Sequence, residues 1–366
     1  MQKRFLFLII VGFTGLGIGA LFPPLKPNAG NSASHAADPE RHALRKEQMG
    51  IEGTRKSGRT HPGKRILELP PLEVDRLRKE HAPEKGKPLR FAERWPVDVT
   101  PSSHGRWKAE GSRANWSIRV KAPGAQNLNL AFSQFRLPES ARLELRVNGE
   151  LMVRPFTAED NENHGELWTP LVAGDELELV LNVAEEEREQ VDLRLNGVNR
   201  GFRAFSLAAG MEKLEGSSPA GDCHIDVVCS AEESGAGGLI DQFRDQIKSA
   251  GVYILSGTYF CSGAAINNTR NDKRPLFLTA DHCGITLSNA ASMLVYWNHE
   301  NSNCRTRGTS SNASAGNGPV NNFNSGARLR ATFEASDMTL VELDDPISED
   351  HGVFLAGWSR AGVPEL

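Results

Sequence analysis

The sequence predicts a mainly β protein, in which an antiparallel β-sandwich is followed by a barrel of short strands. Apolar and polar residues alternate along many short segments, and Asn-Gly pairs follow two of them. All five cysteines lie between Cys223 and Cys304. Alternation with a period of two is the pattern of a strand with one buried face. Short strands at regular intervals, divided by turns, are typical of sandwiches and barrels, and the cysteines set the second region apart from the first.

Length and composition allow two or three globular domains. The chain has 366 residues, 39% of them hydrophobic and 24% charged, with a net charge of −4. These values are ordinary for a folded protein and leave room for a sizeable core. Because no stretch combines a basic field with interleaved aromatic residues, we expect no nucleic-acid partner.

The N-terminus has the features of a secretory signal, which we assign to residues 1–36 with an uncertain cleavage site. Lys3 and Arg4 precede an apolar run from Phe5 to Phe22, and a stretch of small and polar residues follows. This order predicts export to a periplasmic or extracellular location, without stable membrane association after cleavage. A run of this length could alternatively serve as an N-terminal anchor. Residues 37–95 are rich in Lys, Arg, Pro and Gly, which predicts a flexible leader.

Residues 96–205 contain the alternating segments that predict the sandwich. Asn148-Gly149 and Asn196-Gly197 are both turn signals, and the first is a strong hairpin signal. The region holds no cysteine and no convincing catalytic cluster. The expected strands centre on residues 116–120, 128–132, 143–147, 151–153, 177–183 and 191–195.

Residues 206–220 turn small and polar and predict a linker, after which residues 221–366 form the cysteine-bearing region. One helix is expected near residues 239–249, and a Gly/Ser/Asn loop over residues 306–325. Trp358 is expected in the core. Short strands are expected at residues 276–280, 293–297, 327–333, 338–343 and 353–358.

The number of cysteines is odd, so one of them has no partner among these residues. Clustered cysteines in an exported protein favour disulfides over free thiols. The remaining thiol is either a free buried cysteine or one whose partner lies beyond residue 366.

His282 and Asp337 are the candidate catalytic residues. Serine-dependent amide hydrolysis needs a base that moves the hydroxyl proton and a carboxylate that orients the imidazole. His282 follows an apolar strand and directly precedes a cysteine, and Asp337 begins another apolar strand. Asp281 is interpreted as local packing or charge. Asp344 and Asp345 stand before a proline and are expected to be solvated.

No nucleophilic serine is found in the chain. Ser359 lacks the Gly-x-Ser-Gly turn that exposes a nucleophile and forms an oxyanion hole, so it is not an expected substitute.

Several separated motifs resemble, in order, those of bacterial lysyl endopeptidases of the chymotrypsin-like serine protease family. Leu278-Thr279-Ala280-Asp281-His282-Cys283 looks like the family's Thr-Ala-x-His-Cys signature. Leu167-Trp168-Thr169-Pro170 also looks, less specifically, like part of the propeptide of such precursors. The likeness covers about residues 216–360. Its other motifs are Cys261-Ser262-Gly263, Gly221 to Cys229, Ala265 to Thr269, Val295 to Asn298, Asn303 to Arg305 and Ala356 to Trp358.

The resemblance implies a fold and roles for individual residues. The sandwich would be a propeptide domain, and residues 221–366 would be the N-terminal barrel part of a double-barrel protease whose second barrel is largely missing. His282 would be the general base and Asp337 its orienting acid. The disulfides would be Cys261–Cys283 and Cys229–Cys304, and Cys223 would be unpaired.

The same resemblance predicts a secreted serine endopeptidase precursor that acts on proteins or peptides, and it implies cleavage after lysine. Its own propeptide domain would be a partner, and no cofactor or metal is expected. Lys213-Leu214 is the candidate processing bond. A polypeptide that lacks the serine is expected to be inactive, because loss of a triad serine costs on the order of a millionfold in rate.

Two other functions remain possible on the sequence. One is a secreted binding module, in which the sandwich binds carbohydrate or protein and the protease-like part is a dead scaffold. The other is a zinc hydrolase, which we rank last because the sequence has no His-Glu-x-x-His motif or paired Cys-x-x-Cys.

Overall fold

The structure is a computed structural model that describes residues 65–84, 86–203, 225–234, 239–306, 318 and 320–358. The expected signal, most of the leader, the linker with Lys213-Leu214, Cys223 and Ser359 lie outside the described residues, as does most of the expected loop at 306–325. Within the described residues, the chain is mainly β, as the sequence predicts. No helix among them is both long and apolar enough to cross a membrane.

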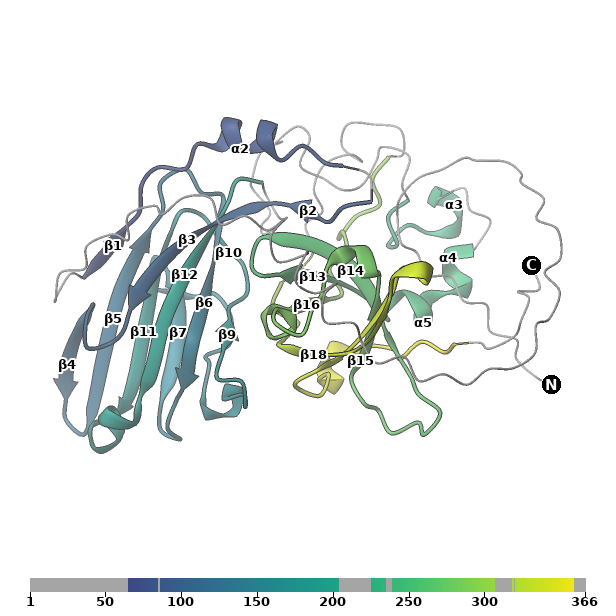
Figure 1. The fold of residues 1–366 in the computed structure, drawn as a ribbon. Helices are drawn as coiled ribbons and strands as arrows, with labels where there is room; N and C mark the ends of the chain where they lie inside the picture. Colours follow the sequence, from purple (N-terminus) through teal and green to yellow (C-terminus); the bar gives the residue numbers. More distant parts are fainter. Residues whose placement is uncertain are drawn as a thin grey trace, which may run out of the picture. The chain divides into compact units, whose positions relative to one another are not determined.

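Two mainly antiparallel sheets form the sandwich (Figure 1). The apolar residues that alternate with polar ones in the sequence are buried in the structure. In β5 these are Ala114, Trp116, Ile118 and Val120. The first sheet has the order β1-β5-β11-β7-β8, with β4 beside β5, and the second has the order β10-β6-β12-β3, with β9 beside β6. The strands of the first sheet are β1 (Ile66–Glu68), β4 (Arg106–Glu110), β5 (Arg113–Lys121), β7 (Arg142–Val147), β8 (Glu150–Leu151) and β11 (Glu176–Ala184). Those of the second are β3 (Ala92–Val99), β6 (Asn127–Arg136), β9 (Leu167–Trp168), β10 (Val172–Ala173) and β12 (Asp192–Gly201).

The two Asn-Gly pairs behave differently. Asn148 and Gly149 join β7 to β8 with φ values of 52° and 86°, as a two-residue hairpin turn requires. Gly197 instead lies inside β12, where the pairing register shifts. A Cβ at Gly197 would stand 2.5 Å from Cζ of Arg94, so the glycine accommodates a close guanidinium. The turn expected at the second pair is therefore a bulge within a strand.

The expectation of an irregular leader up to residue 95 does not hold for residues 65–84 and 86–95. β1 pairs in parallel with β5, and helix α2 (Val74–Glu80) buries Leu77. Leu69 and Leu72 are buried as well. This apolar stretch covers the sandwich core, which explains why it is ordered.

The cysteine-bearing region contributes seven strands to an eight-stranded sheet, in the order β17-β16-β13-β14-β15-β19-β18, and β2, from the stretch just before β3, pairs with β14 as the eighth. At its core, Phe277 makes edge-to-face contacts with Tyr253 and Trp297. The expected single helix is two short ones, α4 (Leu239–Gln242) and α5 (Arg244–Ile247). The strands are β2 (Leu89–Arg90), β13 (Ala250–Leu255), β14 (Tyr259–Ile266), β15 (Leu276–Thr279), β16 (Leu294–Trp297), β17 (Phe323–Ser325), β18 (Ala327–Phe333) and β19 (Met338–Leu343).

Residues 353–358 do not form the expected strand. Ala356 makes only an isolated bridge with Ile266. Trp358 is 43% exposed, and its indole Nε1–H donates to the carbonyl of Asn267. The prediction that Trp358 lies in the core is therefore wrong, because the indole lies against the surface with its polar edge bonded.

The sandwich and the cysteine-bearing region share contacts. β2 pairs antiparallel with Tyr259 and Phe260 of β14. The side chain of Asn129 donates to the carbonyl of Gly257 at 3.1 Å, and the hydroxyl of Tyr296 accepts from the backbone N–H of Leu171 at 2.9 Å. Strand pairing and buried hydrogen bonds thus join the two regions.

Candidate active site

His282 is carried by a short turn at the end of an interior strand. β15 ends at Thr279, and the 3₁₀ turn η3 (Asp281–Cys283) follows. Gly284 closes the turn with a φ of 76°, in the left-handed region that glycine adopts without strain. The side chain of His282 is 32% exposed, so the imidazole can exchange protons with a group outside the sheet.

Asp337 is positioned just before the start of a different strand, β19 (Met338–Leu343). It follows the 3₁₀ turn η5 (Glu334–Ser336) and directly precedes β19. Its φ and ψ are 49° and 48°, an uncommon conformation for a residue with a side chain. β15 and β19 are neighbours in the sheet, with Thr279 opposite Thr339. This register places the turn that carries His282 beside Asp337.

Both carboxylate oxygens of Asp337 contact His282, one through the imidazole and one through the backbone. Nδ1 of His282 lies 2.7 Å from Oδ2 of Asp337, and the backbone N–H of His282 donates to Oδ1 at 2.9 Å. Because a carboxylate only accepts, the imidazole carries its proton on Nδ1 toward Asp337. The Nε2 nitrogen then holds the lone pair. This is the tautomer that a general base needs.

The pKa of Asp337 lies below its usual value. Desolvation alone would raise this pKa, but the backbone and side-chain hydrogen bonds from His282 outweigh it, with smaller help from the imidazole's charge and the backbone of Asp281. The carboxylate therefore stays ionised across the neutral range. An ionised partner can stabilise an imidazolium when His282 takes up a proton.

Two disulfides are present among the described residues, at the pairs that the family resemblance implies. Cys261–Cys283 joins β14 to the residue after His282, with 6.3 Å between the Cα atoms. Cys229–Cys304 links residues 75 apart in sequence, with 4.7 Å between the Cα atoms. The first therefore ties the turn that carries His282 to the neighbouring strand.

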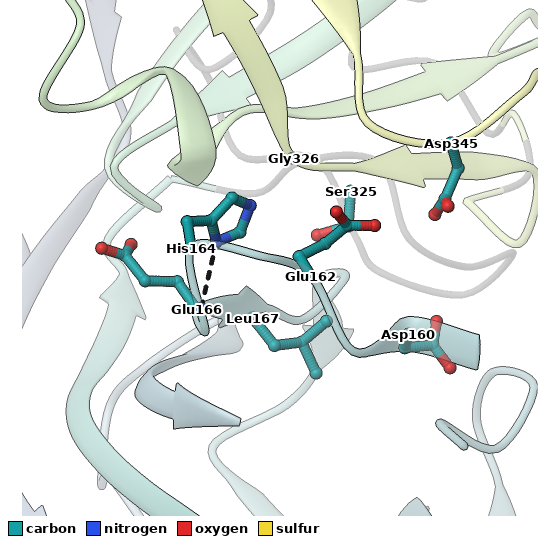
Figure 2. Close-up of a pocket in the computed structure, with 8 residues that line it drawn as sticks. All are labelled: Asp160, Glu162, His164, Glu166, Leu167, Ser325, Gly326 and Asp345. Carbon is teal, nitrogen blue, oxygen red and sulfur yellow. Dashed lines mark hydrogen bonds between the residues drawn. The ribbon is translucent and has the colours of Figure 1, made fainter. Parts of the chain in front are cut away.

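A second cluster of ionisable groups lines a small pocket between the loop that precedes β9 and the ends of β17 and β19 (Figure 2). Its volume is about 10 Å³, roughly enough for one water molecule. The side chain of Asp344 is fully buried, where it accepts from Arg328 and pairs with His164. The expectation that Asp344 is solvated is therefore wrong, because a partner from each region encloses it. The residues that line the pocket are Asp160, Glu162, His164, Glu166, Leu167, Ser325, Gly326 and Asp345.

The pKa values of Asp345 and His164 are raised. Burial, then the neighbouring carboxylates of Glu162 and Asp160, raise the pKa of Asp345 to about 6. The hydrogen bond with Asp344 raises the pKa of His164. Nothing in the sequence around His164 indicates this role, because its partner Asp344 is 180 residues away.

Two groups among the described residues have donor atoms close enough to hold a metal ion. In Cys261, His282 and Cys283, the sulfurs are joined in a disulfide and cannot act as thiolate ligands. In Glu162, His164 and Asp344, both ring nitrogens of His164 are engaged. Nδ1 accepts from the backbone N–H of Glu166, and Nε2 faces Asp344. Neither group offers an imidazole and carboxylates free for a metal.

A mainly β fold with a histidine and an aspartate joined at the end of neighbouring strands, beside a disulfide, fits the chymotrypsin-like class. Comparison with known proteins then gives two matches to lysyl endopeptidases. Residues 217–365 match the family model described as lysyl endopeptidase, C-terminal domain. The chain is also 29% identical over 252 residues to a lysyl endopeptidase of Pseudomonas aeruginosa, across 67% of this chain and 52% of that protein.

These matches support the resemblance to lysyl endopeptidases seen in the sequence, and residues 217–365 are the region that the family model matches. The chain spans about half the length of the curated relative it matches.

Proposed function

We propose that this chain belongs to the precursor of a secreted serine endopeptidase that cleaves peptide bonds after lysine, with His282 as general base and Asp337 as its orienting acid. The contact of 2.7 Å between Nδ1 of His282 and Oδ2 of Asp337 carries the proposal. The family match to residues 217–365 and the name of the P. aeruginosa relative support the reaction class and the preference for lysine.

The geometry suits a proton shuttle. With Nδ1–H directed at Asp337, Nε2 of His282 can accept the proton of an attacking hydroxyl and return it to the leaving amine. Asp337 keeps the imidazole in one tautomer and stabilises its charged form. Neither residue supplies the nucleophile, and the sequence of 366 residues contains no Gly-x-Ser-Gly. We therefore expect the polypeptide of residues 1–366 to be inactive alone.

The rest of the chain has a proposed role in the same precursor. The sandwich is the proposed propeptide domain, and its contacts with the protease region, through β2 on β14 and through Tyr296, support a role as its partner. Cleavage after Lys213 would separate the two. The two disulfides fit a location outside the cytoplasm. A protein or peptide is the expected substrate, with no nucleic acid and no membrane as a stable partner.

The test uses the longest open reading frame that contains these 366 residues, with peptide amides that differ only in the residue before the scissile bond. We expect cleavage after lysine. His282→Ala should lose about a millionfold in kcat, and Asp337→Asn about ten-thousandfold, as in studied triads. Asp350→Asn, at an exposed position of the 3₁₀ turn at residues 349–351, is the matched control and should keep its activity.

Three results would count against the proposal. Full activity of the His282 or Asp337 variant would remove the assigned roles. Turnover by residues 1–366 that His282→Ala abolishes would contradict the expected inactivity. An N-terminus of the secreted form other than Leu214 would remove the proposed processing bond.

A further inference from the structure

Asp281, the residue before His282, reaches across the sheet with its side chain. Its Oδ1 accepts a hydrogen bond of 2.5 Å from the hydroxyl of Thr332. Asp281 belongs to the turn after β15, whereas Thr332 belongs to β18, and β19 lies between these two strands. The hydrogen bond therefore spans the strand that Asp337 precedes.

Thr332 is the outer member of a row of three threonines. Thr332 stands opposite Thr339 in the pairing of β18 with β19, and Thr339 stands opposite Thr279 in the pairing of β19 with β15. The hydroxyls of Thr332 and Thr339 are 2.8 Å apart, and that of Thr279 donates to the carbonyl of Ser262 at 2.7 Å. Thr339 is fully buried. Cross-strand threonine pairs of this kind stabilise a sheet locally.

The donors and acceptors of this row have one consistent order. A carboxylate only accepts, and a threonine hydroxyl has a single proton. Thr332 therefore donates to Asp281, and Thr339 donates to Thr332. The chain of hydrogen bonds runs from buried β19 outward and ends on the carboxylate beside His282.

His282 and Asp337 each lie close in sequence to a residue of this series of hydrogen bonds. Asp281 is adjacent to His282, and Thr339 lies two residues after Asp337. Asp337 holds a left-handed backbone conformation, with a φ of 49°, which persists only where surrounding contacts fix it. Catalytic side chains need to be held within about 0.5 Å of their working geometry.

We propose that Asp281 is a positioning residue, whose hydrogen bond to Thr332 of β18 spans β19 and so fixes the turn that carries His282 against the strand that Asp337 precedes. The proposal rests on the function proposed above, because it assigns the pair His282–Asp337 a catalytic use. Asp281 acts through its acceptor oxygen, and its negative charge is secondary. An asparagine, which offers the same oxygen, can therefore replace it.

The experiment uses the chain of residues 1–366 labelled with ¹⁵N-histidine and needs no turnover. NMR follows two signals of His282: the low-field Nδ1–H resonance, and the protection of its backbone amide from exchange. Both protons face Asp337. Asp281→Ala and Thr332→Val remove the hydrogen bond, whereas Asp281→Asn and Thr332→Ser keep an acceptor and a donor.

We expect Asp281→Ala and Thr332→Val each to lower amide protection by about 3- to 10-fold, as for the loss of one hydrogen bond, and to broaden the Nδ1–H signal. The double variant Asp281→Ala/Thr332→Val should be no worse than either single one, because both remove the same bond. Asp281→Asn and Thr332→Ser should stay within about twofold of the parent. The thermal midpoint should change little, since the bond lies at the surface.

Unchanged His282 signals in Asp281→Ala would overturn the positioning role. The positioning role would also be overturned if Asp281→Asn were as impaired as Asp281→Ala, because the charge of Asp281, and not its hydrogen bond, would then hold the turn. Asp337→Ala separates this idea from the proposed function. It should abolish both His282 signals; if they persist, the pair itself is absent and the proposed function fails whatever Asp281→Ala shows.

Discussion

Raising the pH should weaken the contact between the sandwich and the cysteine-bearing region, through Asp345. This carboxyl faces Glu162 and Asp160 of the sandwich across the small pocket (Figure 2). Burial and these two carboxylates raise its pKa from 3.8 to about 6 in the folded protein. The folded state therefore favours the protonated form. Stability from this group is present below about pH 4 and is lost as the pH rises toward 6.

The size of the effect follows from the shift. Two pKa units correspond to about 3 kcal/mol at full strength. Asp345 is only partly buried, so solvent screening reduces this to about 1 kcal/mol. The positive charge of Arg154 lowers the pKa of Asp345, and the value of about 6 already includes this effect. His164 acts with the same sign, because its raised pKa means that its protonated pairing with Asp344 is lost as pH rises through the folded value.

The assay is urea unfolding of the chain and of Asp345→Asn between pH 4 and pH 8. Asparagine removes the ionisation, so the variant should be about 1 kcal/mol more stable than the parent at pH 8. The difference should disappear near pH 4. Asp192→Asn, at an exposed position of β12, is the control and should show no such trend. A difference between Asp345→Asn and the parent that stays constant over this pH range would refute the reasoning.

Two further predictions concern covalent and steric constraints. Replacing Cys261 and Cys283 by alanine should lower the free energy of unfolding by about 3 kcal/mol, measured in urea, because an open loop regains chain entropy; an unchanged value would contradict this. Gly257→Ala should destabilise the chain by about 1–3 kcal/mol, because its Cβ would lie 2.1 Å from Nδ2 of Asn199 and its φ is +64°. Gly111→Ala is the matched control in the same thermal melts, with a φ of +63° but open space around it, and an equal loss in both variants would show that backbone strain alone acts.

Patterns local in sequence predicted most of the sandwich. Alternation along β5 and β11 marked their buried faces, since a period of two puts every second side chain in the core. Where the prediction failed, a distant residue decided the outcome. Arg94 makes Gly197 a bulge instead of a turn, and the core of the sandwich orders the leader stretch around Leu77.

The same distinction between local patterns and distant contacts applies to the candidate site. The neighbourhood of His282 identified it, because a strand end followed by cysteine is a local pattern. The pocket around Asp344 and His164 could not be found from sequence, since its members come from regions 180 residues apart and no motif surrounds either. In the sequence, Asp344 stands in what looks like an ordinary turn before a proline, and nothing there indicates that its carboxylate is buried.

The contact between His282 and Asp337 also depends on something that neither motif contains, the register of β15 on β19. Thr279 opposite Thr339 sets each strand end so that both oxygens of Asp337 reach His282. A slip of one residue would turn every side chain of β19 to the other face of the sheet. The contacts that hold these strands in place therefore support the geometry of the pair, and the hydrogen bond of Asp281 across β19 is one of them, which is the reason to test Asp281 as well as His282.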